Sequence, residues 1–270
     1  MDFFDPKNWR FVNQYNQANV HSSNVLRSQL LLRNYFLASL ALSEHQMGRK
    51  RHQELKRHIP QIADPQPVEF KEIFELLNKE GNKTVKFLTF GSLMNETSAA
   101  FDIGSKGHPA LTFGLRRIFN FEPPAHAISR LGLPTPGFDE EVARLNVAQC
   151  NRGDSPLCGV LHALTLDEVK ALEKREQGYQ LVKVSVVDYE AAYSEATPKI
   201  EIAYVLVADQ PAPSEPIKPH LNYLNVCLEG ALAHGRGFLS YFLSSTFLSD
   251  GTTPLIEFLR QELVDLACPE

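Results

Sequence analysis

Residues 84–94 read TVKFLTFGSLM, a β-prone run that ends in Gly91-Ser92 and then returns to apolar residues. Residues 85–90 are apolar, aromatic or β-branched enough to predict a buried strand. A glycine at a strand end permits positive φ and lets another group approach the backbone closely. Consecutive amides at such a turn can also form a small anion-binding concavity. The stretch therefore predicts a strand followed either by a plain tight turn or by a ligand-binding loop.

Ser92 does not fit the pattern of a hydrolase nucleophile. The nucleophile elbow of the α/β-hydrolases reads G-x-S-x-G, with a glycine two residues to each side of the serine. Here Phe90 and Met94 occupy those two positions, and Gly91 directly precedes the serine. We therefore assign no covalent role to Ser92.

The segment LTLDEVKALEKREQGYQL, residues 164–181, predicts a short helix followed by a strand. Thr165 and Glu168 have the spacing of a capping box, which predicts a helix that begins at Leu166. Gly178 is placed to end this helix before a strand that begins near Tyr179.

Glu176 is expected on the buried face of this helix. Val169 and Leu172 define that face, and the next position along it is Glu176, whereas residues 173–175 point in other directions. Burying a carboxylate destabilises the fold unless the charge is paired or the group has a function. Desolvation also raises the pKa of the carboxylate toward the range that suits a general base. The alternative is a helix-end glutamate bonded to a nearby arginine or to backbone amides, and the sequence leaves both readings open.

The composition is that of a chain able to bury an ordinary core. Its 270 residues are 43% hydrophobic, with a formal net charge of -5. The mild acidity argues against a broad nucleic-acid surface, which needs clustered lysine and arginine. The most apolar stretch, residues 24–42, is interrupted by Arg27 and Arg33, so we expect no membrane span. The N-terminus has no secretory pattern, and we expect a soluble, cytoplasmic protein.

The cysteines and histidines give no metal-ligand spacing. Four cysteines stand at positions 150, 158, 227 and 268, and no pair of the nine histidines has the spacing of zinc ligands. We therefore expect no metal site, reduced thiols, and a packed role for His162. Residues 233–238, AHGRGF, predict a turn between helices because no strand precedes them.

The sequence divides into two regions with different predicted secondary structure. Residues 1–80 predict a helical N-terminal extension, in which Ser22 or Ser23 caps a helix that runs to about His45. The apolar face predicted for this helix carries Leu26, Leu30, Phe36, Leu37 and Leu40. Residues 81–270 predict one α+β domain, a curved mixed sheet or small β-barrel surrounded by helices. Its predicted strands cover residues 85–90, 110–121, 142–150, 158–165, 179–190 and 200–208. Arg116 and Arg117 lie on opposite faces of the second of these, so at most one of them faces a pocket.

Several segments occur in an order that resembles the gamma-glutamylcyclotransferases and their ChaC-like relatives. The segments are FLTFGSLM (87–94), LTFGLRRIFNF (111–121), ARLNVAQ (143–149), CGVLHALT (158–165) and LEKREQGYQLVKV (172–184). The resemblance covers roughly residues 84–207, and YLNVCLEGALAHG (223–235) is similar to the helical close of some members. No single motif is strong, but the shared order is more specific than any one of them.

This resemblance implies both a reaction and a site. In the family, the loop after the first strand holds a γ-glutamyl group through backbone amides, and a glutamate frees the substrate's α-amine to attack its own γ-carbonyl. The products are 5-oxoproline and an amine or amino acid, and no metal or organic cofactor is needed. The roles carry over to Glu176 as the base, and to Phe90, Gly91, Ser92, Leu93 and Tyr179 as substrate-binding residues.

Two departures from the family pattern leave an alternative open. The family's tyrosine before the Gly-Ser pair is Phe90 here, so one hydroxyl is missing, and the long N-terminal extension has no counterpart. The alternative is a non-catalytic member of the same fold that binds a γ-glutamyl or amino-acid ligand, or a protein partner. The partner that we expect is a small γ-glutamyl substrate, with its exact identity and the oligomeric state left open.

Overall fold

The computed structural model describes residues 20–40, 64–79, 83–100, 103–104, 106–123, 140–151, 154, 156–176, 179–193, 198–208, 213 and 215–267. The predicted helix end at Gly178, the predicted helix residues 41–45 and Cys268 lie outside these residues.

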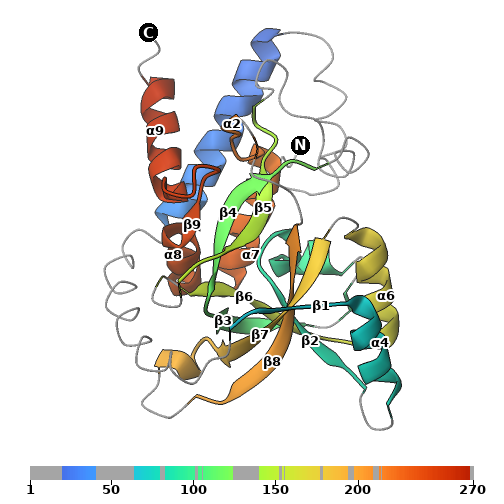
Figure 1. Ribbon diagram of the computed structural model, residues 1–270. Coiled ribbons are helices and arrows are strands. Elements are labelled where there is room, and N and C mark those ends of the chain that lie inside the picture. Colours follow the sequence, from blue (N-terminus) through green and yellow to red (C-terminus); the bar gives the residue numbers. More distant parts are fainter. Residues whose placement is uncertain are drawn as a thin grey trace.

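The protein has an α+β fold built around a closed barrel, which confirms the predicted fold class (Figure 1). The strand order is β1-β7-β3-β6-β2-β8, and β7 also pairs with β8, so that five strands close into a ring while β1 extends it. The strands of this sheet are β1 (Gln66–Val68), β2 (Val85–Thr89), β3 (His108–Thr112), β6 (Leu157–Leu164), β7 (Tyr179–Asp188) and β8 (Ile200–Ala208). The strand β1 lies within the predicted extension and pairs with β7.

A second sheet stands beside the barrel and has the order β5-β4-β9. Its strands are β4 (Leu115–Phe121), β5 (Arg144–Gln149) and β9 (Thr246–Phe247). The sequence predicted residues 110–121 as one strand, and this was wrong. Gly114 has φ of 80°, a left-handed conformation that breaks the run, so that β3 stays in the barrel and β4 joins the second sheet.

Helices cover two sides of the barrel (Figure 1). The helices are α2 (Val20–Ser39), α4 (Phe70–Asn78), α5 (Glu96–Ala99), α6 (Leu166–Arg175), α7 (Leu221–Ala233), α8 (Arg236–Ser244) and α9 (Leu255–Ala267), with 3-10 turns η4 (Ser92–Met94) and η6 (Ala191–Tyr193). α4 packs near α6, whereas α2 packs with α7 and α9 on the side of the second sheet. The predicted turn at residues 233–238 joins α7 to α8 through Gly235, whose φ is 102°. None of the described helices is long and apolar enough to cross a membrane.

The helix α2 differs from its prediction at both its start and its buried face. It begins at Val20, before either predicted cap, and Phe36 is 62% exposed. The buried face instead carries Arg27, Leu31, Asn34 and Ala38. Arg27 donates through Nε to Glu141 at 2.6 Å and through Nη2 to Glu262. Polar contacts therefore fix α2 on the domain together with apolar packing.

Candidate functional site

The loop after β2 is a tight 3-10 turn. The amide of Met94 donates to the carbonyl of Gly91 at 3.0 Å, which closes the turn. In the described part of the chain, the amides of Gly91, Ser92 and Leu93 donate no hydrogen bond to a protein group. Whether these three donors bind a ligand stays a prediction of the sequence.

Gly91 is explained by a close approach rather than by a positive φ. Its φ is -124°, so the positive φ that a strand-end glycine allows is not used. A Cβ at this position would stand 2.4 Å from the hydroxyl oxygen of Tyr223, a buried residue of α7, and 3.9 Å from Cβ of Leu145. A real Cβ does not tolerate the first of these contacts, so a side chain here would displace Tyr223.

A buried arginine fixes the start of the loop. Arg117 of β4 is fully buried, and its Nε donates to the carbonyl of Phe90 at 3.0 Å. Its other nitrogens donate to the carbonyl of Cys158 and to Thr246 Oγ1, and the guanidinium lies 4.1 Å from the ring centroid of Phe242. The charge is thus satisfied by carbonyl and hydroxyl oxygens together with a ring face, and Phe90 cannot shift without breaking this arrangement.

The helix α6 begins where the sequence predicted. Thr165 and Glu168 form the capping box, which confirms the predicted start at Leu166. The helix ends at Arg175, and the amide of Glu176 still donates to the carbonyl of Leu172 at 2.9 Å. The position of Glu176 is therefore set by the last turn of α6.

Glu176 is partly buried and forms an ion pair with Arg175. Its side chain is 18% exposed, and that of Arg175 is 16% exposed, whereas Glu173 and Lys174 are exposed. Arg175 Nε lies 2.8 Å from Glu176 Oε1. The prediction that Glu176 alone among these charges points inward was wrong, because Arg175 accompanies it. The ion pair also matches the alternative of a helix-end glutamate bound by a neighbouring arginine.

Strand register places the loop and Glu176 at the same end of the barrel. β2 runs parallel to β8 with Phe87 opposite Tyr204. β2 ends at Thr89, two residues before Gly91, and β8 ends at the same end of the barrel at Ala208, which is the partner of Tyr179 at the start of β7. Tyr179 follows Glu176 by three residues, so α6 returns to the barrel at this same end.

The second sheet covers this end and adds Arg144, the first residue of β5. Its Cα pairs with that of Phe121, whose ring centroid lies 5.0 Å from that of Tyr179. The guanidinium carbon lies 5.9 Å from the ring centroid of Tyr223. Burial lowers the pKa of Arg144, while Tyr223, Tyr179 and Glu176 act in the opposite direction. Arg144 therefore links the residue that packs on Gly91 to the group around Glu176.

The two tyrosines stay protonated at neutral pH. Burial raises the pKa of Tyr179, and the nearby carboxylate of Glu176 adds to this effect. Burial also raises the pKa of Tyr223 well above its usual value. Both hydroxyls are thus hydrogen-bond donors or acceptors rather than phenolate bases.

Sequence reasoning missed Arg144 and Tyr223. Both lie within segments that carry the family resemblance, ARLNVAQ and YLNVCLEGALAHG, and that position was the one available signal. Both residues are far in sequence from Gly91, so no spacing pattern connects them to it. Their contacts with each other and with the loop depend on how the second sheet and α7 pack on the barrel.

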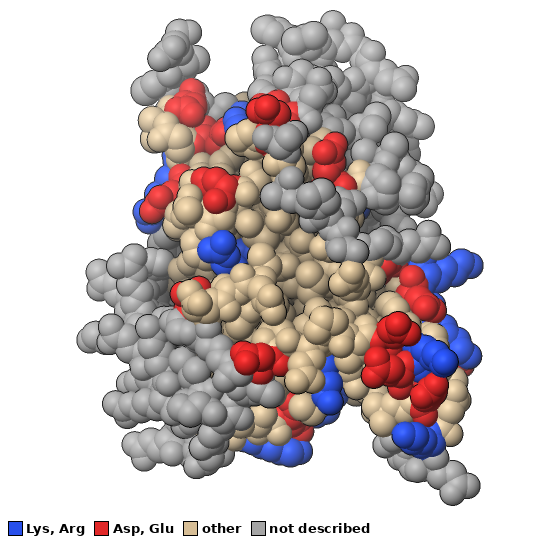
Figure 2. All heavy atoms as spheres, in the orientation of Figure 1, with Lys and Arg blue, Asp and Glu red and all other residues tan. Residues whose placement is uncertain are grey.

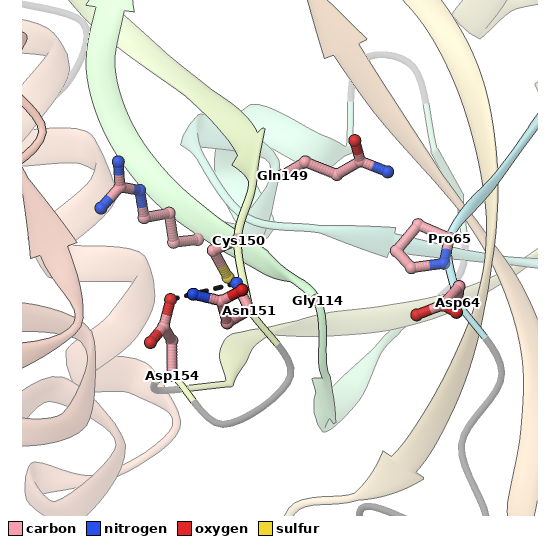
Figure 3. Close-up of a pocket in the computed structure, with 8 residues that line it drawn as sticks. Asp64, Pro65, Gly114, Gln149, Cys150, Asn151 and Asp154 are labelled. Atoms are coloured by element: carbon pink, nitrogen blue, oxygen red, sulfur yellow. Dashed lines mark hydrogen bonds between the residues drawn. The ribbon is translucent and has the colours of Figure 1, made fainter.

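A surface pocket of about 450 Å³ lies at the opposite end of the β4–β5 pair (Figure 3). Asp64 and Pro65 stand on one side of it, Cys150 and Asp154 on the other, with Gly114 between them. Leu115 pairs with Gln149 at this end, whereas Phe121 pairs with Arg144 at the other. Arg116 lines this pocket while Arg117 is buried, so only one of the two faces it, as the alternation predicted.

The described residues were compared with the requirements of a metal site and of a basic surface. No group of three or more potential metal ligands comes together among the described residues. Figure 2 shows acidic and basic side chains interspersed on the face that it presents.

No protein-family model and no curated protein sequence matches the chain. It is similar in structure to an uncharacterized protein from Homo sapiens, at 14% identity and a TM-score of 0.42, over 57% of this chain and 81% of that one. A solved structure named "Gamma-glutamyl cyclotransferase" gives the same values. YkqA from Bacillus subtilis is 14% identical with a TM-score of 0.39, over 58% of this chain and 50% of that one. No activity follows from similarity at this level.

Proposed function

We propose that the protein is an enzyme of the γ-glutamyl cyclotransferase type. The α-amine of a γ-glutamyl substrate attacks the substrate's own γ-carbonyl, and 5-oxoproline and an amine or amino acid are released. The observation that carries the proposal is the strand register that sets the loop at Gly91 and the helix end at Glu176 on one end of the barrel. The motif order in the sequence supports the same assignment.

Glu176 acts as the general base in this proposal. An α-ammonium group has no lone pair, so a carboxylate must first accept one of its protons. The freed amine then adds to the γ-carbonyl carbon, and the bond from that carbon to the leaving nitrogen breaks. The leaving nitrogen takes the proton back from Glu176, which restores the carboxylate, and the ring nitrogen gives up its second proton, so that the amine leaves as an ammonium ion. The ion pair with Arg175 orients the carboxylate for both transfers.

The loop supplies the electrostatic part of catalysis. Three amide donors at residues 91–93 are available to the γ-carbonyl oxygen, on which negative charge develops during the attack. Because nucleophile and electrophile belong to one molecule, holding the glutamyl chain bent supplies much of the acceleration. Arg117 supports this role indirectly, since it fixes the carbonyl of Phe90 directly before the loop.

Phe90 lacks the hydroxyl of the family's tyrosine, but another hydroxyl, that of Tyr223, lies close to the loop. The hydroxyl of Tyr223 lies against Gly91, the very next residue, although it comes from α7 rather than from the loop. A hydroxyl group is therefore present at the loop in spite of the phenylalanine.

The second candidate function is binding without turnover, by a non-catalytic member of the same fold. Two observations favour it: Phe90 replaces the family tyrosine, and Glu176 is engaged by Arg175. In that case the same end of the barrel would hold a γ-glutamyl or amino-acid ligand without releasing 5-oxoproline.

A panel of γ-glutamyl compounds tests the proposal and separates the two candidates. The full-length protein is incubated with γ-glutamyl peptides and γ-glutamylamines, and 5-oxoproline is measured by mass spectrometry. We expect release from at least one compound, lowered about 10²-fold or more in Glu176→Gln, which keeps the size but cannot accept the proton. Glu173→Gln on the exposed face of α6 is the matched control and should keep full activity. Near-normal turnover by Glu176→Gln would exclude this residue as the base.

A further inference from the structure

Arg144 lies between the two halves of the proposed site. On one side, its guanidinium faces the ring of Tyr223, whose hydroxyl contacts Gly91. On the other side, the Cα partner of Arg144 is Phe121, whose ring packs on Tyr179 three residues after Glu176. Arg144 therefore contacts the tyrosine that packs on the loop and also interacts electrostatically with Glu176.

The γ-glutamyl group has three polar parts that a site must hold. The γ-carbonyl oxygen becomes negative during the attack, the α-amine has to be deprotonated, and the α-carboxylate is attached to the same carbon as the amine. When Glu176 reaches the amine, the α-carboxylate lies within a few ångströms of that position. A cation near this position would offset the repulsion between the two carboxylates.

The two arginines at this end have different surroundings. Arg175 lies directly against Glu176, next to it in the chain. Arg144 comes from another sheet and is set among aromatic rings, where Glu176 and Arg175 both act on it electrostatically. A guanidinium presents a planar fork of donors that matches a carboxylate, and partial burial strengthens such a bond.

We propose that Arg144 forms a carboxylate subsite that binds the α-carboxylate of the γ-glutamyl group. This inference rests on the proposed function and deepens it. The three polar parts of the substrate then have separate partners: the amides of residues 91–93 for the γ-carbonyl oxygen, Glu176 for the amine and Arg144 for the carboxylate. The substrate class is thereby narrowed to γ-glutamyl compounds whose α-carboxylate is free, and α-amides or α-esters are excluded.

The product and its amide provide the test. Binding of 5-oxoproline and of 5-oxoprolinamide to the full-length protein is measured by calorimetry, with the two ligands differing in the carboxylate alone. A hydrogen-bonded charge pair predicts that the wild type prefers the acid by about tenfold or more. Arg144→Gln should abolish this preference and raise KM for a γ-glutamyl substrate more than it lowers kcat. Arg116→Met, which removes an arginine at the other end of β4, is the control and should keep the preference.

The outcomes separate this inference from the proposed function. Equal affinity of the wild-type protein for acid and amide would overturn the carboxylate subsite, and this measurement needs no variant. So would an Arg144→Gln protein that is folded and keeps the wild-type preference. In either case continued release of 5-oxoproline would leave the proposed function standing. If the wild type neither releases nor binds 5-oxoproline, both fall.

Discussion

The two ends of the β4–β5 pair are built in opposite ways. At one end, Gly114 and Cys150 line an open, polar pocket of about 450 Å³. At the other end, Arg144 is packed among Tyr179, Tyr223 and Phe121, close to the loop after β2. The open end has the surface pocket, whereas the packed end has Glu176, the loop at residues 91–93 and the partly buried Arg144.

Two of the described side chains at the open end, Cys150 and Arg116, are poorly suited to catalysis. Burial raises the pKa of Cys150 to about 11, with the carboxylate of Asp154 adding to the effect, so the thiol is neutral at physiological pH and a poor nucleophile. Arg116 donates to the carbonyl of Gly251 at 3.1 Å, so it is committed to a structural contact. The comparison shows that, in this protein, the volume of a surface pocket indicates a functional site less well than a cluster of charged residues does.

The largest effect should follow the loss of Arg117, which anchors the packed end. Arg117→Met leaves the carbonyls of Phe90 and Cys158 without their donor in a buried place, and we expect a loss of about 3 kcal/mol in the free energy of unfolding. Arg116→Met, at the open end, should cost less than about 1 kcal/mol. Urea unfolding measures both. Equal losses would contradict the view that Arg117 fixes the loop.

A side chain at Gly91 should come next, with an effect on function. Gly91→Val places a branched side chain where the hydroxyl of Tyr223 now lies, so the ring must move away from the loop and from Arg144. We expect turnover or 5-oxoproline affinity to fall by about 10²-fold, equivalent to about 2.7 kcal/mol. Ser92→Ala keeps every loop amide and should stay within about threefold of wild type. A Gly91→Val protein with normal affinity would rule out the loop as a contact.

The packed end is tied to the helical layer through Glu141, three residues before Arg144. Burial raises the pKa of Glu141 from its usual 4.5 to about 7, against the opposing effect of Arg27, while Glu262 and Glu140 raise it further. The folded state therefore keeps a proton that the unfolded chain has released, and stability falls as the pH rises from about 4.5 to about 7. One such proton contributes a slope of at most about 1.4 kcal/mol per pH unit.

Glu141→Gln should remove this slope, which denaturant unfolding at several pH values would measure. An unchanged pH dependence in the variant would show that another group causes it.

The smallest effect should come from the open pocket. Asp154→Asn removes a carboxylate that accepts from the amide of Asn151 at 3.1 Å but leaves the packed end untouched. We expect activity within about twofold and stability within about 0.5 kcal/mol of wild type. A large loss of turnover in this variant would contradict this account and would place the active site in the open pocket.

Local signals in the sequence predicted the elements around the site well. The capping box at Thr165 and the strand at residues 85–90 depend on nearby residues, and both were found within one residue of the expected limits. Two elements were misjudged because tertiary packing overrode a local pattern. Gly114 divides an apparently continuous strand, and α2 buries Arg27 and Asn34 while Phe36 stays exposed.

The site itself could be predicted only in part. Glu176 and Gly91 were visible from helix periodicity and from the strand end, but their relation depends on the register between β2, β8 and β7. Arg144 and Tyr223 could not be found from spacing, since they come from β5 and α7 and meet only in the folded chain. A nearby arginine was one of the two readings left open for Glu176, but the sequence did not identify Arg175, because a helical wheel places consecutive residues about 100° apart.

The most direct test of the central claim is to locate 5-oxoproline on the protein by NMR titration. The account predicts that the amide signals of residues 91–93 and of Tyr179 shift with a single saturable affinity, and that the signals of Gly114, Gln149 and Cys150 do not move. The same titration of Glu176→Gln should keep these shifts, since the variant loses proton acceptance and not the loop. Shifts confined to the residues of the open pocket, or divided between the two ends of the β4–β5 pair, would contradict a single site at the packed end.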